Sequence, residues 1–293
     1  MSNRAALYIV ATPIGNLEDL TPRAQRVLAE VALIAAEDTR HSGKLLQHFH
    51  ITTPVIALHE HNEREQVPAL IERLRNGESL ALLSDAGTPL VSDPGYHLVR
   101  AAHEAGLRVV PLPGACAAVV ALSAAGLPTD RFTFEGFPPA KTAARRHYYE
   151  TLRAEPRTLV FYESPHRILE SLNDMADVFG ADREVTVARE LTKQFETIRT
   201  GRLSELVGWV RGDEHQQLGE FVLIVRGADV VTAGADSAAE GERILKILLD
   251  ELPLKQAVSL ASRLSGEPRN RLYDLALVMQ KGSFKPDGSP PDL

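Results

Sequence analysis

Two aspartates lie in a loop of small residues and prolines that follows a fully apolar run. The run is Leu80–Leu83 and the loop is Ser84–Gly95. Small residues let a backbone approach a flat ligand closely, and the carboxylates of Asp85 and Asp93 can accept hydrogen bonds from hydroxyls or balance a cation. The loop is therefore a candidate ligand site, although for any one loop taken alone an ordinary turn is the simpler explanation of turn residues.

Two further loops follow apolar runs in the same way. Thr12–Asn16 contains a single glycine, so it is neither a dinucleotide fingerprint nor a phosphate-binding P-loop. Pro111–Ala117 lies where a strand pattern changes into a helix of small side chains, and the free amides at such a helix start can donate hydrogen bonds. Ligands of parallel α/β sheets bind at the carboxyl ends of strands, so the loops that follow the apolar runs are the most informative about a ligand site.

Several acidic and imidazole groups lie in polar loops near the expected strand ends, where they could act as general acids or bases. The candidates are Asp38, Glu60, His61, Glu163, His166 and Glu190, with Asp38, Glu60, Glu163 and His166 preferred. Their spacing does not single out one base. For each group taken alone, a solvated loop position or a structural ion pair is the simpler explanation.

Basic residues are candidates for contacts with nucleic-acid phosphates. They are Arg40, Lys141, Arg145, Arg146, Arg167, Lys193, Arg269 and Arg271. The segment 141–149 mixes basic with aromatic residues, which is typical of a surface that holds an RNA backbone and stacks a base. An exposed amphipathic helix explains this segment nearly as well.

A metal site is not expected. His59 and His61 have the His-x-His spacing with which some hydrolase metal sites begin, but the later histidines follow no matching pattern. The single cysteine, Cys116, excludes an internal disulfide and a cysteine-cluster zinc site, and no basic partner is implied that would make it a nucleophile.

The elements that must position these loops alternate between short strands and helices. In the first 127 residues we expect strands at 7–11, 32–36, 55–58, 80–83 and 108–112, and helices from Thr21-Pro22 and over 41–49, 63–76, 95–106 and 115–125. This alternation predicts parallel crossovers and an α/β layer architecture. A run at 126–130 marks the first domain boundary.

A second α/β domain is expected over 128–229. Its expected strands are 132–134, 158–162, 185–188, 196–200 and 221–225, and its expected helices are 142–153 and 165–179. We expect a small-residue linker at 230–241, a helical module at 242–281 and a disordered tail at 282–293. Within the module, 254–264 and 270–280 flank a tight turn at 265–268, as in a helix-turn-helix, so the module either contacts RNA or only packs on the body.

Composition sets outer limits on the function. The chain has 293 residues and a formal net charge of −7, which argues against a protein that coats nucleic acid over its whole surface but allows a local basic patch. No apolar run reaches the length of a membrane span, and the first residues lead directly into a strand pattern. A cytoplasmic protein is expected.

Taken together and in order, these loops resemble the tetrapyrrole methylase superfamily. The resemblance is carried by Leu7–Leu17, the aspartate loop at Asp85 and the turn at Pro113–Cys116. Further motifs resemble the branch of this superfamily that acts on small-subunit ribosomal RNA: Glu37–Arg40, His59–Glu63, Ser84–Gly95 and Phe161–Arg167. The likeness runs collinearly from residue 6 to about residue 228 and extends into the helical module.

The resemblance implies a two-domain tetrapyrrole-methylase-like fold with S-adenosylmethionine in a cleft between the domains, and no metal. It also implies a homodimer and 2′-O-methylation of a decoding-site cytidine in the 16S rRNA of the small ribosomal subunit. The positions that match cofactor-binding motifs are Pro13, Asp85, Ala86, Gly87, Thr88, Pro113, Gly114, Cys116, Ala117, Tyr162, Ala188 and Phe221. This chain has Ala115-Cys116 where the family usually has proline-serine, so a hydroxyl contact to the cofactor is in doubt.

Three rival functions remain at this point. One is C-methylation of a corrinoid or porphyrin precursor, which the branch-specific motifs and the helical module disfavour. Another is a non-catalytic nucleic-acid-binding regulator, which the acidic charge and the many polar loops disfavour. The third is a metal-dependent hydrolase, which metal analysis of the purified protein would detect.

Overall fold

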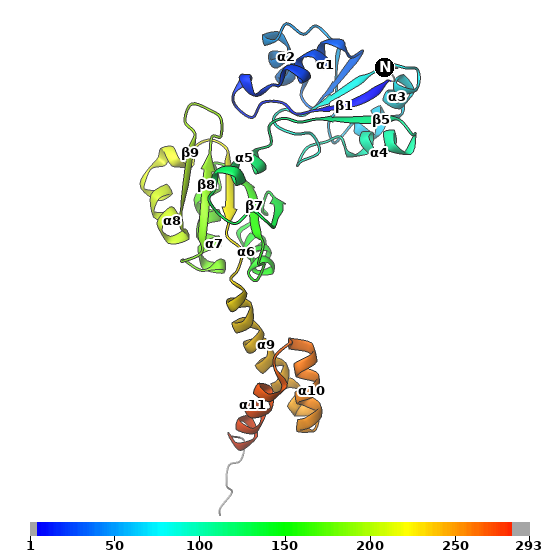
Figure 1. The fold of residues 1–293 in the computed structure, drawn as a ribbon. Helices are drawn as coiled ribbons and strands as arrows, with labels where there is room; N and C mark the ends of the chain where they lie inside the picture. Colours follow the sequence, from blue (N-terminus) through cyan, green and yellow to red (C-terminus); the bar gives the residue numbers. More distant parts are fainter. Residues whose placement is uncertain (1–4, 283–293) are drawn as a thin grey trace, which may run out of the picture. The chain divides into compact units, whose positions relative to one another are not determined.

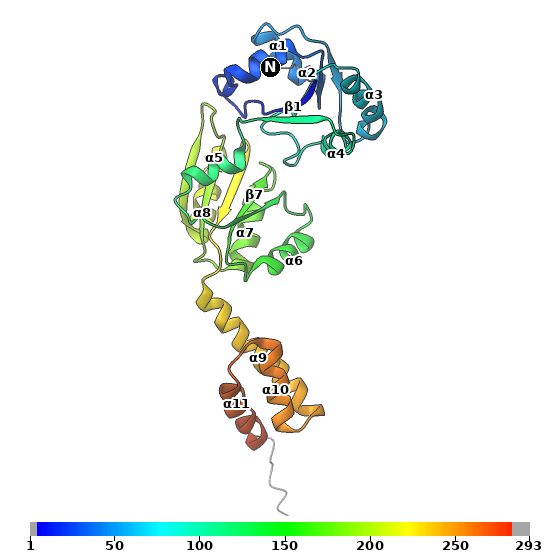
Figure 2. The same ribbon diagram turned by 45° about the vertical axis from the view of Figure 1, so that its right-hand side comes forward.

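The structure is a computed structural model that describes residues 5–282, with side chains described for 5–229 and 240–279. The chain divides into two compact units. The first contains residues 1–152 and 157–226, and the second contains residues 153–156 and 227–293. The first unit holds two α/β domains, each built on its own five-stranded sheet, and the second is helical (Figures 1 and 2).

The first domain is a parallel sheet with the strand order β3-β2-β4-β1-β5. Its elements are β1 (Ala6–Val10), α1 (Pro22–Glu30), β2 (Leu33–Ala36), α2 (Thr39–His48), β3 (Val55–Ala57), α3 (Glu63–Arg75), β4 (Leu80–Leu83), α4 (Tyr96–Glu104) and β5 (Arg108–Leu112), with a short 3-10 helix at Leu17–Asp19. These elements confirm the expected parallel α/β alternation, with ends that differ by at most two residues.

Both faces of this sheet are covered, because alternate residues of each strand point to opposite sides. On one face Val10, Ile34 and Leu83 pack with residues of α1 and α2. On the other face Leu7 and Leu82 pack with residues of α3 and α4. The strands are therefore apolar throughout, as the sequence pattern indicated.

The second domain contains a mixed sheet with the order β6-β7-β10-β8-β9, in which only β6 and β7 are parallel. Its elements are β6 (Phe132–Gly136), α6 (Thr142–Leu152), β7 (Thr158–Glu163), α7 (Ile168–Phe179), β8 (Glu184–Arg189), β9 (Thr197–Arg202), α8 (Leu203–Gly212), a 3-10 helix at Glu214–Gln217, and β10 (Phe221–Val225). Helix α8 was not predicted, and α7 begins three residues later than predicted, because residues 165–167 form a turn.

Helix α5 (Ala117–Ala124) belongs to the first half of the sequence but packs on the second sheet. Ala118, Ala121 and Leu122 share a buried cluster with Val160 of β7 and Val222 of β10. The opposite face of that sheet packs against α6, α7 and α8. Small side chains on α5 allow this close packing, so the turn before α5 lies against both domains.

The second unit consists of α9 (Val230–Glu251), α10 (Leu254–Ser265) and α11 (Arg269–Gly282). Leu245, Val258 and Leu272 form the centre of its core. Residues 230–241, expected as a linker, are helical and form the start of α9. This stretch is rich in alanine, the strongest helix former, which accounts for a helix where a small-residue linker was expected.

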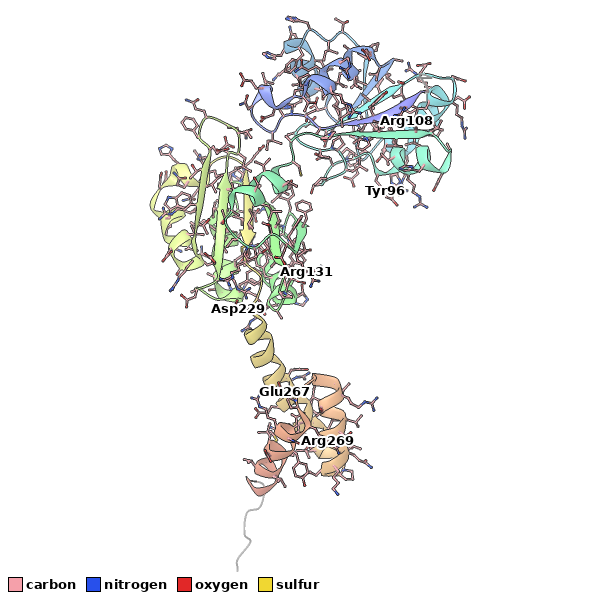
Figure 3. All side chains as sticks on the ribbon, viewed as in Figure 1. Tyr96, Arg108, Arg131, Asp229, Glu267 and Arg269 are labelled. Atoms are coloured by element: carbon pink, nitrogen blue, oxygen red, sulfur yellow. The ribbon has the colours of Figure 1, made fainter. Side chains whose placement is uncertain are left out.

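Glu267 lies in the turn between α10 and α11 and Arg269 begins α11 (Figure 3). The expected helix pair around a tight turn is therefore present. The expected tail at 282–293 lies outside the described residues apart from Gly282, the last residue of α11. Among the helices that the structure describes, none combines the length and apolarity needed to cross a membrane.

Candidate active site

The loops after β1 and β4 lie side by side at the carboxyl edge of the first sheet. β1 and β4 are neighbours, and the chain leaves them on opposite faces, since α1 packs on one face and α4 on the other. Such a topological switch point is where open α/β sheets bind ligands. Thr12 and Gly87 tie the two loops together, each amide donating to the other residue's carbonyl oxygen, at 2.8 and 3.1 Å.

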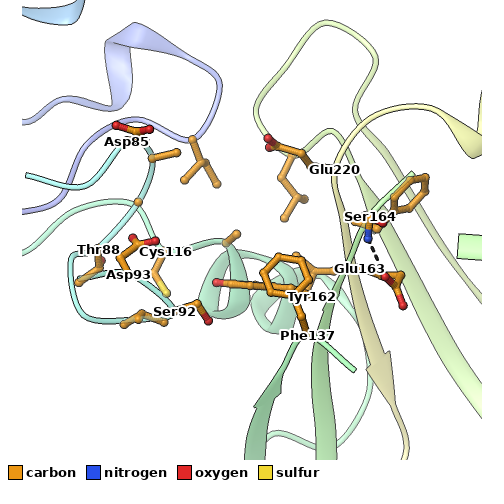
Figure 4. A pocket seen from close by; sticks show the side chains of 18 of the residues that line it. Asp85, Thr88, Ser92, Asp93, Cys116, Phe137, Tyr162, Glu163, Ser164 and Glu220 are labelled. Atoms are coloured by element: carbon orange, nitrogen blue, oxygen red, sulfur yellow. Dashed lines mark hydrogen bonds between the residues drawn. The ribbon is translucent and has the colours of Figure 1, made fainter. Parts of the chain in front are cut away.

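A cavity of about 410 Å³ opens beside these loops, within the roughly 300–1,000 Å³ of small-molecule sites. In Figure 4, Asp85, Thr88 and Asp93 of the first domain lie across the cavity from Glu220 and Tyr162 of the second. The lining residues are Ile14, Glu37, Asp85, Ala86, Gly87, Thr88, Val91, Ser92, Asp93, Cys116, Ala117, Phe137, Tyr162, Glu163, Ser164, Pro165, Leu191, Glu220, Phe221 and Val222. The cavity is thus formed by both α/β domains of the first unit.

The charged groups of the cavity wall are all carboxylates: Glu37, Asp85, Asp93, Glu163 and Glu220. As far as the structure describes the chain, no lysine, arginine or histidine lines this cavity. Burial raises the pKa of Asp93 to about 6, with the carboxylates of Glu37 and Asp85 adding to the rise and a hydrogen bond with Ser84 opposing it. Burial, followed by the charge of Asp85, also raises the pKa of Glu37. The wall is suited to a ligand that carries positive charge.

Glu163 is a buried carboxylate with one free oxygen. Its Oε1 accepts from the Ser164 amide and from the Arg167 guanidinium, both at 2.8 Å. Its Oε2 has no hydrogen-bond partner within the described residues. A buried carboxylate oxygen without a hydrogen-bond donor raises the free energy of the folded protein. A donor group on a ligand in the cavity would supply the missing hydrogen bond to Oε2.

Aromatic rings form the part of the wall next to α5. The Tyr162 ring packs edge-on against Phe134 and Phe137, with centroid separations of 4.9 and 5.5 Å. The Tyr162 hydroxyl accepts from the Ala118 amide at 3.3 Å, and burial raises its pKa to about 12, so it stays protonated. Rings held in this way provide a flat apolar surface.

Most of the sequence-predicted cofactor residues line the cavity: Asp85, Ala86, Gly87, Thr88, Cys116, Ala117, Tyr162 and Phe221. Pro13 lines a neighbouring cavity instead, and Ala188 is buried in the core below the site. Pro113 and Gly114 lie outside the lining, and a Cβ on Gly114 would come within 2.7 Å of the Ala11 Cβ. These last two residues shape the turn that carries Cys116.

Sequence reasoning missed several wall residues, notably Glu37, Phe137, Leu191 and Glu220. Glu37 begins the Glu37–Arg40 motif, and Glu220 directly precedes a strand whose first residue was assigned, so both gave a usable signal. Phe137 gave none, because an aromatic residue after a strand reads as core.

Of the four preferred acid–base candidates, only Glu163 lines the cavity. The Asp38 carboxylate accepts from the Arg40 amide and pairs with its guanidinium at 2.9 Å, and the hydrogen bond from that side chain lowers its pKa to about 2. Glu60 and His166 are exposed and lie outside the lining.

One predicted RNA-binding residue is corrected by the structure. Arg145 is fully buried and pairs with Asp174 at 2.7 Å, with a further hydrogen bond to the Ala140 carbonyl. Because Arg145 lies on the inner face of α6, RNA cannot reach its side chain. The mixture of basic and aromatic residues in this segment did not show which face of the helix is buried.

The other predicted basic residues are placed as follows. Arg167 is held by Glu163, and Lys193 is held by Glu190 and Glu220 at 2.8 and 3.0 Å. Exposed side chains belong to Arg40, Lys141, Arg146, Arg269 and Arg271, and of these Arg40, Arg146 and Arg271 form ion pairs with neighbouring carboxylates.

The histidine pair does not assemble a metal site in the part of the chain that the structure describes. His59 and His61 have ring centroids 6.0 Å apart, and no group of three or more potential ligands includes them. The His59 Nδ1 is buried without a partner among the described residues.

Comparison with known proteins identifies both parts of the chain. Residues 6–207 match the model of the Tetrapyrrole (Corrin/Porphyrin) Methylases, and residues 235–280 match the RsmI C-terminal HTH domain. Curated relatives named ribosomal RNA small subunit methyltransferase I include one from Pseudomonas aeruginosa, 59% identical over 94% of this chain and 97% of the relative. Another, from Escherichia coli O157:H7, is 55% identical over 95% of this chain and 97% of the relative.

Solved structures of the same fold agree. Uroporphyrin-III-C-methyltransferase from Thermus thermophilus is 25% identical with a TM-score of 0.52, covering 76% of this chain and 94% of that one. Diphthine synthase is 15% identical with a TM-score of 0.56, covering 76% of this chain and 90% of that one. The expected tetrapyrrole-methylase fold with a helix-turn-helix module is therefore confirmed. The chain belongs to the ribosomal RNA small subunit methyltransferase I family of the tetrapyrrole methylases.

Proposed function

We propose that this chain transfers a methyl group from S-adenosylmethionine to the ribose 2′-hydroxyl of a decoding-site cytidine in the 16S rRNA of the small ribosomal subunit. The observation that carries the proposal is the cavity at the switch point of the first sheet, whose wall contains five carboxylates and the rings of Tyr162 and Phe137. The names of the curated relatives supply the class of substrate.

The residues present fit S-adenosylmethionine. Its sulfonium and ammonium groups are positive, and the charged residues of the cavity are all acidic. The free Oε2 of Glu163 can accept from a donor on the cofactor, and the rings of Tyr162 and Phe137 offer a surface for a flat base. We assign Asp85, Asp93, Glu163 and Tyr162 as the residues that hold it.

When bound, S-adenosylmethionine supplies an activated methyl group. The chain's task is then to align the acceptor oxygen, exclude water and receive the hydroxyl proton. Two carboxylates, Asp85 and Glu220, line both this cavity and a second one next to it. We assign the proton to Asp85, because Glu220 is already paired with the Lys193 ammonium at 3.0 Å. The Asp38 amide donates to Asp85 Oδ1 at 3.0 Å and fixes its orientation.

The assay that tests the function uses S-adenosylmethionine labelled in its methyl group. The purified chain is incubated with naked 16S rRNA, with small ribosomal subunits, or with a corrinoid precursor, and the label is mapped. Label on a single cytidine ribose is expected. Transfer to the corrinoid precursor and to neither RNA would contradict the proposal.

Replacing Asp85 tests its assigned role. Asp85→Asn keeps an oxygen that can accept from the Asp38 amide but removes the basic carboxylate. We expect turnover to fall by about 10²–10⁴-fold, the usual contribution of general base catalysis, while the Kd for S-adenosylmethionine changes by less than about tenfold. Equal losses in turnover and in cofactor binding would show that Asp85 only binds the cofactor.

A homodimer in the cytoplasm completes the proposal, as the resemblance implies. Light scattering during size-exclusion chromatography should give the mass of two chains. The mass of one chain would contradict this part and leave the methyl transfer untouched.

A further inference from the structure

A second cavity of about 450 Å³ lies directly beside the first. The two share the wall residues Ile14, Asp85, Ala86 and Glu220. The other lining residues of the second cavity are Thr12, Pro13, Gly15, Leu17, His41, Ser42, Lys44, Leu45, His48, Ser84 and Lys193. A group bound here therefore reaches the first cavity across a shared wall.

One face of α2 supplies a lysine and two imidazole groups to this second cavity. His41, Lys44 and His48 are three and four residues apart, so they form a stripe on a single side of the helix. All three side chains are exposed. Within the side chains that the structure describes, no ion pair engages Lys44, whereas the Lys193 ammonium is already shared between Glu190 and Glu220.

Ser42 adds an independent observation on the same helix. It lines the second cavity and is only 2% exposed. Its hydroxyl has no hydrogen-bond partner among the described residues. Buried hydroxyls are nearly always paired, so the missing partner points to a ligand that the chain alone does not contain.

The two cavities differ in charge, and this difference separates their ligands. The first contains five carboxylates and no basic side chain, so it repels anions. The second contains the stripe on α2, with Asp85 and Glu220 confined to the shared wall. An RNA strand that places a ribose at the shared wall must place its neighbouring phosphates within a few ångströms.

We propose that the second cavity binds a backbone phosphate of the RNA substrate next to the acceptor ribose, with Lys44 as the main cation, His41 and His48 beside it, and Ser42 as a hydroxyl donor. The proposal rests on the proposed function, because it takes the first cavity as the cofactor site. It adds four residues, none of them among the predicted RNA contacts, and places the acceptor strand along α2.

The carboxylate of S-adenosylmethionine is the other anion that could occupy this cavity. A phosphate is favoured because His41, Lys44 and His48 lie on an exposed helix face, where an RNA strand can reach them. An experiment can separate the two anions. If the cavity binds an RNA phosphate, replacing Lys44 raises the Kd for RNA, and if it binds the cofactor carboxylate, the same replacement raises the Kd for S-adenosylmethionine.

The test measures RNA and cofactor binding separately on full-length variants. The RNA is 16S rRNA or the small subunit, whichever the unmodified chain methylates. Lys44→Ala should raise the Kd for RNA about tenfold, the effect of one charge-assisted contact, with the Kd for S-adenosylmethionine within twofold. The matched control is Arg75→Ala, since Arg75 is exposed, pairs with Glu72 and lines neither cavity. It should leave both constants within twofold.

Ser42→Ala provides a second, structural check. Removing a buried hydroxyl that lacks a partner should leave the Tm unchanged or raise it, yet RNA binding should weaken severalfold. Equal RNA affinities for Lys44→Ala and Arg75→Ala would overturn the proposal. So would a rise in the Kd for S-adenosylmethionine alone, which would assign the cavity to the cofactor carboxylate. Failure of the unmodified chain to methylate RNA would instead reject the proposed function.

Discussion

Asp93 is buried beside the carboxylates of Glu37 and Asp85, and its pKa is therefore raised to about 6. Its charge changes between pH 5 and 7, where binding can be measured. Its pKa of about 6 means that the carboxylate is largely ionised only above that pH. A cationic ligand binds the ionised form, so we expect S-adenosylmethionine to bind more tightly as the pH rises from 5 to 7. Asp93→Asn should weaken binding at pH 7.5 about tenfold and flatten this dependence, as measured by calorimetry.

The control for this experiment is Asp130→Asn, because Asp130 is exposed and does not line the cavity. It should retain the full pH dependence. The same shift has a consequence for folding, since a carboxyl with a raised pKa in the folded state stabilises the fold below its unfolded pKa of 3.8 and loses that contribution as the pH rises through about 6. An Asp93→Asn variant whose binding still followed pH would show that another group titrates.

Arg145 was predicted to contact RNA because it is basic, but its side chain is buried in a structural ion pair. Replacing Arg145 with methionine leaves the buried Asp174 with only the longer contact to Arg146 at 3.8 Å, and we expect a loss of about 3–5 kcal/mol in the free energy of unfolding. Arg146→Ala breaks an exposed pair with Asp177 at 2.9 Å and the longer contact with Asp174 at 3.8 Å but leaves Arg145 on Asp174, so it should cost about 1 kcal/mol or less. Urea denaturation measures both, and similar small losses for the two variants would contradict the structural role of Arg145.

At the scale of elements, the loop between β4 and α4 is held in an uncommon backbone conformation. Leu90 and Ser92 have φ angles of 72° and 66°, and Gly95 has a φ angle of 124°. A Cβ atom added to Gly95 would lie only 2.5 Å from Leu82 Cδ2. Positive φ at non-glycine residues costs free energy and is concentrated at functional sites. This loop supplies Asp93 to the cavity wall.

Gly95→Ala should therefore lower the free energy of unfolding by about 1–3 kcal/mol and weaken cofactor binding, because the loop must shift. Gly43→Ala is the matched control. Gly43 lies inside α2 with nothing within 4 Å of an added Cβ, so the alanine should stabilise by up to about 1 kcal/mol. Thermal denaturation and cofactor titration of the pair compare the two, and unchanged binding in Gly95→Ala would show that the loop does not set the site.

At the scale of the whole molecule, a net charge of −7 limits how the chain can hold RNA. Only local groups of basic side chains can contribute, so few phosphates are neutralised. We expect the logarithm of RNA affinity to fall against the logarithm of salt concentration with a slope between about −1 and −4, while cofactor affinity changes little. Filter binding at several salt concentrations measures this. A slope near zero would contradict binding through phosphates.

The features that could be predicted from the amino-acid sequence are those that depend on residues close together in the chain. Apolar runs and their spacing predicted the strands of both sheets, and the loops after Val10 and Leu83 were recognised as the site because strand ends gather at one edge. The start of α9 was misread because composition does not distinguish an alanine-rich helix from a flexible linker.

The α/β alternation, the switch-point loops and the family could be predicted from the amino-acid sequence, since each follows from residues that are near one another in the chain. Which charges are buried, and which cavity each carboxylate lines, became known from the folded structure. Asp93, Glu163 and Glu220 come from distant segments, and Arg145 turns inward beside Arg146, which stays outside. Burial and proximity set the free energy of a charge, and both arise when separate elements pack together.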